Sequence, residues 1–173
     1  MKGVITLALK EMVIQNFGIE KWQEALKMVG IDSEPFIMPI SNLEDQLVLR
    51  IIQSLCEILE VSLSQAADLF GEYWMKNYAP KMYSAYFSGK ESARDFLLAM
   101  DKVHVETTKL INDARPPRFE FEWRDDKTLI MKYISKRDLI DFMVGLIKGV
   151  GSYYEENLQV KKLSHDEVMI VFP

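Results

Sequence analysis

The chain has 173 residues, of which 49% are hydrophobic and 27% charged, and its net charge at pH 7 is −5. The basic residues are spread along the chain, which argues against a nucleic-acid-binding protein, and no apolar run approaches the roughly 18 residues of a membrane span. The single cysteine, Cys56, excludes an internal disulfide and a zinc site made of several thiolates, so we expect a folded protein of the reducing cytoplasm.

Apolar residues recur at helical spacing through the first two thirds of the chain, which predicts a series of helices. Ser41, Ser62 and Ser88 are each followed three residues later by Glu or Gln, a capping-box pattern that marks a helix start. The predicted helices are Val4–Phe17, Glu20–Val29, Leu43–Leu59, Leu63–Tyr78 and Gly89–Ala114. Pro116 and Pro117 end the last one, because proline removes a backbone donor and disfavours helix before it.

After the prolines the hydrophobic period changes from helical spacing to two, which predicts strands with one buried face. Two hairpins follow, one on each side of a further helix. Their strands are near 119–123 and 129–133, then 158–163 and 168–172, and the helix between the hairpins is Asp138–Tyr153. The predicted fold class is therefore α+β, with a helical N-terminal part followed by an antiparallel sheet and its packed helices. His165 falls in the turn of the second hairpin, where we expect it to be solvated.

His104 lies on the apolar face of the predicted helix 89–114, in line with Leu97, Met100 and Ile111. A buried imidazole needs a partner, because an unsatisfied buried polar group costs roughly 1–3 kcal/mol. A metal, a carboxylate or a backbone carbonyl would each suffice, and an ordinary hydrogen-bonded core histidine is the more frequent case. The position alone leaves these alternatives open.

Tyr133, Ser135 and Arg137 leave the first hairpin at alternate positions of an extended segment, so their side chains point the same way. A phenol, a hydroxyl and a guanidinium placed together can bind one carboxylate, which Arg can hold through two hydrogen bonds. The alternative is structural: Ser135 would cap the next helix with Asp138 three residues on, Tyr133 would be a core aromatic residue, and Arg137 would be a surface charge.

Five segments together closely resemble the heme-nitric oxide/oxygen binding (H-NOX) family of gas sensors, which is related to the heme domain of soluble guanylate cyclase. In chain order they are Met1-Lys2-Gly3, Phe87-x-Gly89, Met100-Asp101-x-Val103-His104, Pro116-Pro117-Arg118 and Tyr133-Ile134-Ser135-Lys136-Arg137. Each segment alone is a weak signature, but the set in this order is strong and covers essentially the whole chain.

The resemblance implies a single heme domain over residues 1–173, with a helical N-terminal subdomain (about 1–60), an α/β heme-binding subdomain (about 61–173) and the heme between them. His104 would be the proximal ligand of a heme b iron. Tyr133, Ser135 and Arg137 would hydrogen-bond the heme propionates, and Pro117 would press on the porphyrin and distort it.

The resemblance also implies a distal pocket on the face opposite His104, formed by Ile5, Leu9, Trp74, Tyr78, Phe142 and Leu146. Oxygen-binding members of the family carry a tyrosine where this chain has Phe142. A mainly apolar wall offers a bound gas no strong donor, and distal polarity is a main determinant of ligand choice. We therefore expect a sensor of nitric oxide and carbon monoxide that excludes oxygen.

A sensor needs a partner, and the resemblance implies a histidine kinase or a cyclic-di-nucleotide enzyme as a separate protein. We expect a binding module rather than an enzyme, because no Ser/His/Asp arrangement or pair of carboxylates stands out. Two alternatives remain. One is an oxygen-binding heme sensor that uses Trp74 or Tyr78 as distal donor. The other is a heme-free interaction domain in which His104 is a hydrogen-bonded core residue.

Overall fold

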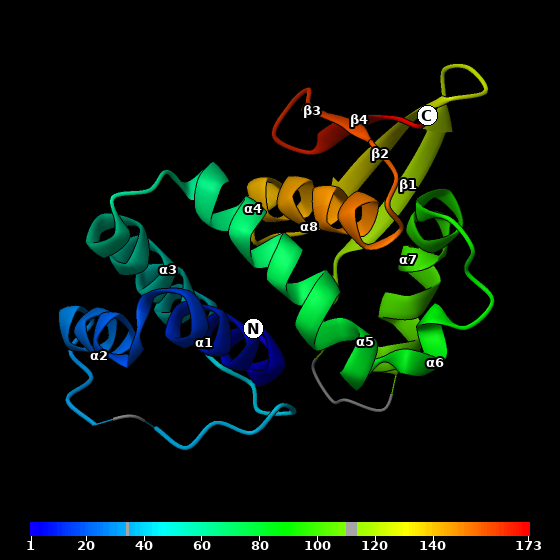
Figure 1. Ribbon diagram of the computed structural model, residues 1–173. Coiled ribbons are helices and arrows are strands. Elements are labelled where there is room, and N and C mark those ends of the chain that lie inside the picture. The colour runs from blue at the N-terminus through cyan, green and yellow to red at the C-terminus, as the bar shows by residue number, and fades with distance from the viewer. Residues whose placement is uncertain (34, 110–113) are drawn as a thin grey trace. The chain divides into compact units, whose positions relative to one another are not determined.

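The computed structural model describes residues 1–33, 35–109 and 114–173, which form two compact units, 1–66 and 67–173. The α+β class predicted from the sequence is confirmed, with helices throughout the first unit and a four-stranded antiparallel sheet in the second (Figure 1). Among the described residues, no helix combines the length and the apolarity needed to cross a membrane.

The first unit is built from three helices whose apolar faces form a shared core. They are α1 (Gly3–Phe17), α2 (Ile19–Met28) and α3 (Asp45–Leu59), each within two residues of its predicted bounds. Trp22 of α2, Val13 of α1 and Val48 of α3 are all almost completely buried, so one residue from each helix anchors this core. The helical period of the sequence arises from this packing.

The predicted capping box is correct at only one of its three positions. At the start of α4 (Leu63–Tyr73), the Ser62 hydroxyl accepts a hydrogen bond from the Gln65 N–H at 3.2 Å, and the Gln65 side chain accepts one from the Ser62 N–H at 2.9 Å. The Ser41 hydroxyl instead accepts from the Met38 N–H, four residues before α3 begins, so this predicted box is wrong.

The helix that carries His104, α7, is Ala93–Thr108 rather than 89–114. Gly89 has a φ of +72°, a left-handed conformation that interrupts a helix, so the predicted start at Ser88 is wrong. The actual cap is Ser92, whose hydroxyl accepts from the Asp95 N–H at 3.1 Å. Residues 110–113 of the predicted helix, with Ile111, lie outside the described residues.

The predicted helix 63–78 is interrupted by a π-helical turn. After α4 the chain forms η1 (Trp74–Tyr78), followed by the short helices α5 (Ala79–Met82) and α6 (Ser84–Phe87). A π turn is rare and is found mostly at functional sites. It changes the angular positions of Trp74 and Tyr78, the two aromatic residues that the sequence analysis assigns to a gas pocket.

Both predicted hairpins are confirmed and join in one sheet of strand order β1-β2-β4-β3. The elements are β1 (Arg118–Trp123), β2 (Thr128–Ile134), α8 (Ile140–Tyr153), β3 (Gln159–Lys162) and β4 (Glu167–Val171). The turn between β1 and β2 is closed by the Asp125 carboxylate, which accepts from the N–H groups of Lys127 and Thr128. His165 lies in the β3–β4 turn with its side chain 83% exposed, as predicted.

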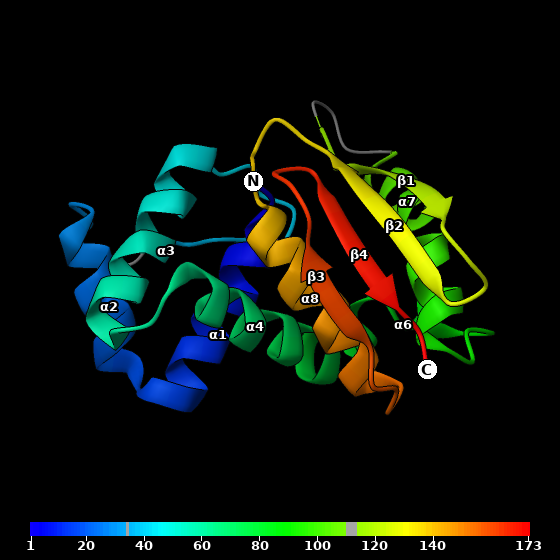
Figure 2. The same cartoon turned by 90° about the horizontal axis from the view of Figure 1, so that it is seen from above.

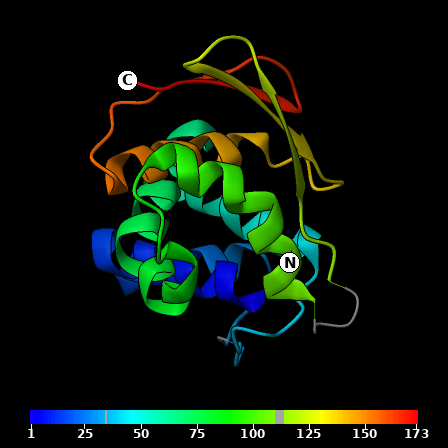
Figure 3. The same cartoon turned by 90° about the vertical axis from the view of Figure 1, so that its right-hand side faces the viewer.

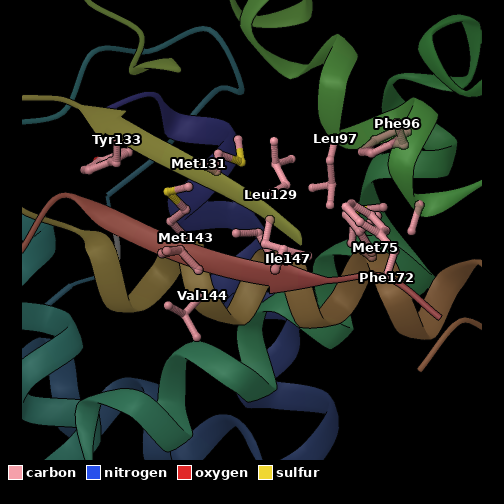
Figure 4. Packing of buried hydrophobic residues seen from close by; sticks show 14 of the residues in the cluster. Met75, Phe96, Leu97, Leu129, Met131, Tyr133, Met143, Val144, Ile147 and Phe172 are labelled. Atoms are coloured by element: carbon pink, nitrogen blue, oxygen red, sulfur yellow. The ribbon is translucent and has the colours of Figure 1, made fainter. Parts of the chain in front are cut away.

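Helix α8 runs along one face of this sheet, and α7 packs beside the edge strand β1 (Figures 2 and 3). Side chains of β2, α7 and α8 meet in the main core of the second unit, including Met131, Leu97 and Ile147 (Figure 4). This core holds the two segments of interest in place, because His104 lies on α7 and Tyr133 on β2.

Glycines allow α8 to touch the backbone of α4. A Cβ added at Gly145 would lie 2.1 Å from the Ala67 carbonyl oxygen, and one at Gly149 would lie 2.2 Å from that of Gly71. Any side chain at these positions would force the helices apart. The glycines therefore fix the distance from α4 to α8, which carries Phe142 and Leu146.

Candidate functional site

His104 is a half-buried residue in the last two turns of α7, and its ring is held on two sides. Its Nδ1 lies 2.8 Å from the carbonyl oxygen of Met100, one turn earlier on the same helix. The ring of Phe119, on β1, lies edge-on to the imidazole, with the two centroids 5.2 Å apart and the planes at 70°. The imidazole plane is thus fixed by one hydrogen bond and one aromatic contact.

The hydrogen bond to Met100 determines which nitrogen of His104 can bind a metal. A carbonyl oxygen only accepts, so Nδ1 must carry the proton, and in the neutral ring Nε2 then keeps its lone pair. Burial lowers the pKa of His104 from its ordinary value of 6.5, so the ring is neutral at pH 7. Nε2 is therefore prepared as a ligand, with its tautomer fixed in the manner typical of metal-bound histidines.

Tyr133, Ser135 and Arg137 come together at the end of β2, as the alternation predicts. The Tyr133 hydroxyl hydrogen-bonds with the Ser135 side chain, and the Arg137 guanidinium is close enough to act on the phenol by its charge. Burial is the main cause of the raised pKa of Tyr133, so this phenol remains a neutral donor at pH 7. The three donors form one cluster suited to a carboxylate.

The structural alternative for these three residues is wrong in one respect. Ser135 does not cap α8, because its hydroxyl accepts a hydrogen bond from the Arg137 N–H at 3.3 Å and the residue that precedes α8 is Leu139. Asp138 adopts a φ of +51° rather than a helical one. The segment is a compact loop that keeps the three side chains together.

Pro117 is half-buried and lies directly before β1, next to the cluster in the fold. Arg137 makes this connection, since its Nη1 donates to the carbonyl oxygen of Arg115 at 2.8 Å. The double proline and the loop after β2 are therefore joined through Arg137. The family resemblance implies that both belong to one site.

The predicted pocket residues of the second unit lie in an aromatic group between η1 and α8. Trp74 stacks on Tyr78 at a centroid distance of 5.3 Å and an interplanar angle of 17°, and on Phe70 at 5.8 Å and 30°. Phe70 in turn makes an edge-to-face contact with Phe142, with the two ring centroids 5.6 Å apart. Leu146, one turn after Phe142 on α8, is half-buried.

Ile5 and Leu9 belong to α1 of the first unit, where Ile5 is half-buried and Leu9 is buried. The Trp74 ring packs against Phe70, Tyr78 and Tyr83.

Sequence reasoning missed Phe119, which contacts His104, and Phe70, which connects Trp74 to Phe142. The alternation of β1 predicts Phe119 on the buried face of a strand, but it does not indicate that the ring contacts a histidine. The carbonyl of Met100 could have been anticipated, because it lies four residues before His104 on a helix. Cys56 is half-buried, and burial is the main cause that raises the pKa of its thiol, which makes it a less reactive group than an exposed cysteine.

Among residues 1–33, 35–109 and 114–173, no group of three or more His, Cys, Asp or Glu side chains is placed to hold a metal ion. Metal binding at His104 would therefore require a cofactor that supplies the other ligands. The cluster at Tyr133 offers donors for the carboxylates of such a cofactor. A heme has both features, an iron with an open axial position and two propionates.

A family model described as Haem-NO-binding matches residues 2–162 of the chain. The chain is also similar to soluble guanylate cyclase gcy-32 of Caenorhabditis elegans, with 24% identity over 160 residues, 87% of this chain and 22% of that protein. It thus spans less than a quarter of the length of this curated relative.

The fold is similar to solved structures over 99% of the chain. A Cs H-NOX mutant carrying 4-cyano-L-phenylalanine has a TM-score of 0.89 at 27% identity, with 96% of its chain covered. An oxygen-binding H-NOX domain related to soluble guanylate cyclases, in its oxygen complex, has a TM-score of 0.83 at 28% identity, with 95% covered. An H-NOX mutant of T. Tengcongensis has a TM-score of 0.84 at 27% identity, with 97% covered.

Proposed function

The chain belongs to the Haem-NO-binding family of heme-dependent gas sensors, and from this we propose that it is a cytoplasmic sensor that binds nitric oxide and carbon monoxide, and not oxygen, at a heme b. His104 would be the protein ligand of the iron. The observation that carries the proposal is the hydrogen bond from His104 Nδ1 to the Met100 carbonyl, which leaves Nε2 with a free lone pair on a neutral ring.

When bound, the heme would supply an iron with an open coordination position for a diatomic gas. The roles of the chain's own residues follow from their chemistry. His104 would hold the iron from one side, while Tyr133, Ser135 and Arg137 would neutralise and orient the propionates through charge-assisted hydrogen bonds. Pro117 lies two residues after Arg115, whose carbonyl oxygen accepts a hydrogen bond from Arg137. Its rigid ring would press on the porphyrin and distort it from planarity.

The selectivity for nitric oxide rests on Phe142. Its side chain cannot donate a hydrogen bond, and its ring packs against Phe70 in an aromatic group. A structural relative is an oxygen-binding H-NOX domain, so the family fold itself does not exclude oxygen. The choice of gas would therefore depend on the distal side chains, for which the family resemblance implies Ile5, Leu9 and Leu146 as well as the aromatic residues.

The residues 1–173 would form one heme domain, with the first unit as its helical subdomain and the second as its heme-binding subdomain. No catalytic role is proposed for the chain. The signal would pass to a separate histidine kinase or cyclic-di-nucleotide enzyme, as the family resemblance implies.

The first test is heme retention by the variant His104→Gly. It should lose the Soret absorption band of the purified protein, and free imidazole should restore it, because imidazole can replace the missing ligand. The matched control is His165→Gly, which removes the exposed histidine and should keep its heme. A His104→Gly protein with an unchanged spectrum and no imidazole would refute the assignment, and a colourless native protein given heme would favour the heme-free alternative.

The second test is the spectrum of the reduced protein under each gas. Nitric oxide and carbon monoxide should each shift the Soret band, and air should not produce a stable oxygenated spectrum. Phe142→Tyr, which adds a donor, should raise oxygen affinity about tenfold to a hundredfold, the worth of one hydrogen bond in a dry site.

One observation favours a second candidate function, an oxygen-binding sensor. Trp74 belongs to the same aromatic group as Phe142, because both rings contact Phe70, and its indole N–H is a donor that a bound gas could use. Tyr78, stacked on Trp74, would be the other donor in this case. A persistent oxygenated spectrum in air that disappears in Trp74→Phe would support this candidate and leave the heme assignment intact.

A further inference from the structure

The carboxylate of Asp101 connects α7 to β1 one turn before His104. Its Oδ1 accepts hydrogen bonds from Arg118 Nε at 2.7 Å and from the backbone N–H of Phe119 at 2.9 Å, and its Oδ2 accepts from Arg118 Nη2 at 2.7 Å. The paired guanidinium is the main cause that lowers the pKa of Asp101 to about 2, so the carboxylate remains charged.

The hydrogen bond to Phe119 uses a backbone donor that the sheet leaves open. Strand β1 is an edge strand, and Phe119 lies opposite Tyr133 in the register with β2. The Tyr133 N–H donates to the Asp166 carbonyl on the other side of β2, so Phe119 and Tyr133 form a pair that exchanges no backbone hydrogen bond. The Phe119 N–H therefore points away from β2, where Asp101 accepts it.

Phe119 is also the residue whose ring contacts His104. Its centroid lies 5.2 Å from that of the imidazole and 6.1 Å from that of Tyr133. One residue thus has its backbone held by Asp101 and its ring placed against both His104 and Tyr133. A displacement of Phe119 would remove the aromatic contact that, together with the hydrogen bond to Met100, holds the imidazole.

We propose that Asp101 is a positioning residue, which holds Phe119 through its backbone N–H and thereby fixes the imidazole plane of His104. This inference rests on the proposed role of His104 as the iron ligand. In the heme-loaded protein, Asp101 would set how well the Nε2 lone pair is directed at the iron. The ion pair with Arg118 has a smaller part, since it keeps the carboxylate charged and in place.

The test uses the full chain without heme first, so that it does not depend on the loaded protein. In Asp101→Ala, the Phe119 amide should exchange with solvent about tenfold faster, the loss expected for one hydrogen bond to a charged group. Nitrogen chemical shifts of His104 should change from a single tautomer to a mixture. Arg118→Gln keeps the bond to Phe119 and should have a much smaller effect on both.

Glu106→Gln is the matched control. Glu106 is a carboxylate two residues after His104 on the same helix, paired with Lys102 at 3.7 Å and not bonded to β1, so its removal should change neither measurement. Phe119→Leu is the second variant, for the case that Asp101→Ala does not fold. It keeps the backbone N–H and removes the ring, and it should also yield mixed tautomers.

The same variants are then loaded with heme and reduced, and the iron–histidine stretching band is recorded. Asp101→Ala and Phe119→Leu should shift this band to lower frequency and broaden it, while Glu106→Gln should not. Folded Asp101→Ala and Phe119→Leu proteins with the native tautomer and the native band would overturn the proposal. If the native protein shows no iron–histidine band, or if its band persists in His104→Gly, the proposed function is refuted instead. The heme-free measurements would still decide the positioning role of Asp101.

Discussion

At the scale of single residues, the donor cluster after β2 gives the clearest prediction. Arg137→Ala removes a guanidinium that would make a charge-assisted hydrogen bond worth roughly 1.5–3 kcal/mol to a propionate. Heme dissociation should therefore become about tenfold to a hundredfold faster, while the spectrum of the retained heme stays nearly native because His104 is untouched. Transfer of heme to an excess of a heme-scavenging protein measures the rate. Lys136→Ala, the exposed neighbour, is the control, and equal rates in the two variants would contradict the propionate role.

Tyr154, at the end of α8, gives a prediction about pH. Its hydroxyl oxygen is buried and has no hydrogen-bond partner within the described part of the chain, and burial is the main cause that raises its pKa to about 12. The folded state thus resists the loss of this proton, which the unfolded chain gives up near pH 10. The contribution of Tyr154 to stability is complete below pH 10 and is lost as the pH rises towards 12.

Tyr154→Phe should therefore weaken the decrease in the free energy of unfolding above pH 10, measured by urea denaturation at a series of pH values. At pH 7 the variant should be as stable as the native protein or more stable by about 1 kcal/mol, because an unsatisfied hydroxyl has been removed. Tyr86→Phe, on the short helix α6, serves as the control. An unchanged alkaline profile in Tyr154→Phe would show that the phenol does not resist ionisation in the folded state.

At the scale of elements, the contact of α4 with α8 depends on glycines rather than on interlocking side chains. Gly149→Ala places a Cβ 2.2 Å from the Gly71 carbonyl oxygen, a distance that the backbone must relieve by moving. The variant should lose about 1–3 kcal/mol of stability, the usual cost of overpacking, and thermal unfolding measures it. Because the displaced helix carries Phe142 and Leu146, the kinetics of gas binding should change as well. The control is Gly30→Ala in the first unit, where no atom lies within 4 Å of the added Cβ.

Gly30 has a φ of +83°, so its alanine variant tests strain without a clash. Loss of stability in Gly30→Ala with native gas kinetics would separate a general destabilisation from a displacement of α8. Native kinetics in a folded Gly149→Ala protein would contradict the idea that glycines set the position of the pocket residues on α8.

The elements also mark the limits of prediction from sequence. Hydrophobic period predicted both hairpins and the helices of the first unit, because each buries one face against its neighbours. Capping boxes were less informative. The Ser88 pattern is followed by Gly89, whose left-handed backbone prevents a helix from starting there. The sequence did not predict the π turn at 74–78, because it shifts the apolar pattern by one residue within a single turn, and apolar spacing is read over several turns.

At the scale of the whole molecule, sequence patterns and family resemblance identified the segments of the candidate site, but not the contacts between them. The alternation at 133–137 correctly predicted a cluster of donors, since geometry along one strand is local. The clamp of Asp101 on Arg118 and Phe119 joins residues 17 and 18 positions apart, and the Ala93 N–H is capped by Glu156 from 63 residues away. Such contacts depend on how elements pack, which a single sequence does not record.

The π turn has one more consequence, for the register of the chain. An α-helix advances about 100° per residue, so the additional residue in η1 rotates everything after it by roughly that angle relative to an uninterrupted helix. A chain shortened by one residue at the exposed Asn77 could close η1 into an ordinary helix, and Tyr78 would then leave its stack on Trp74. Homologous chains that are one residue shorter in η1 would therefore present a different side chain at the position next to Trp74. The apolar patterns before and after η1 would still match those of this chain.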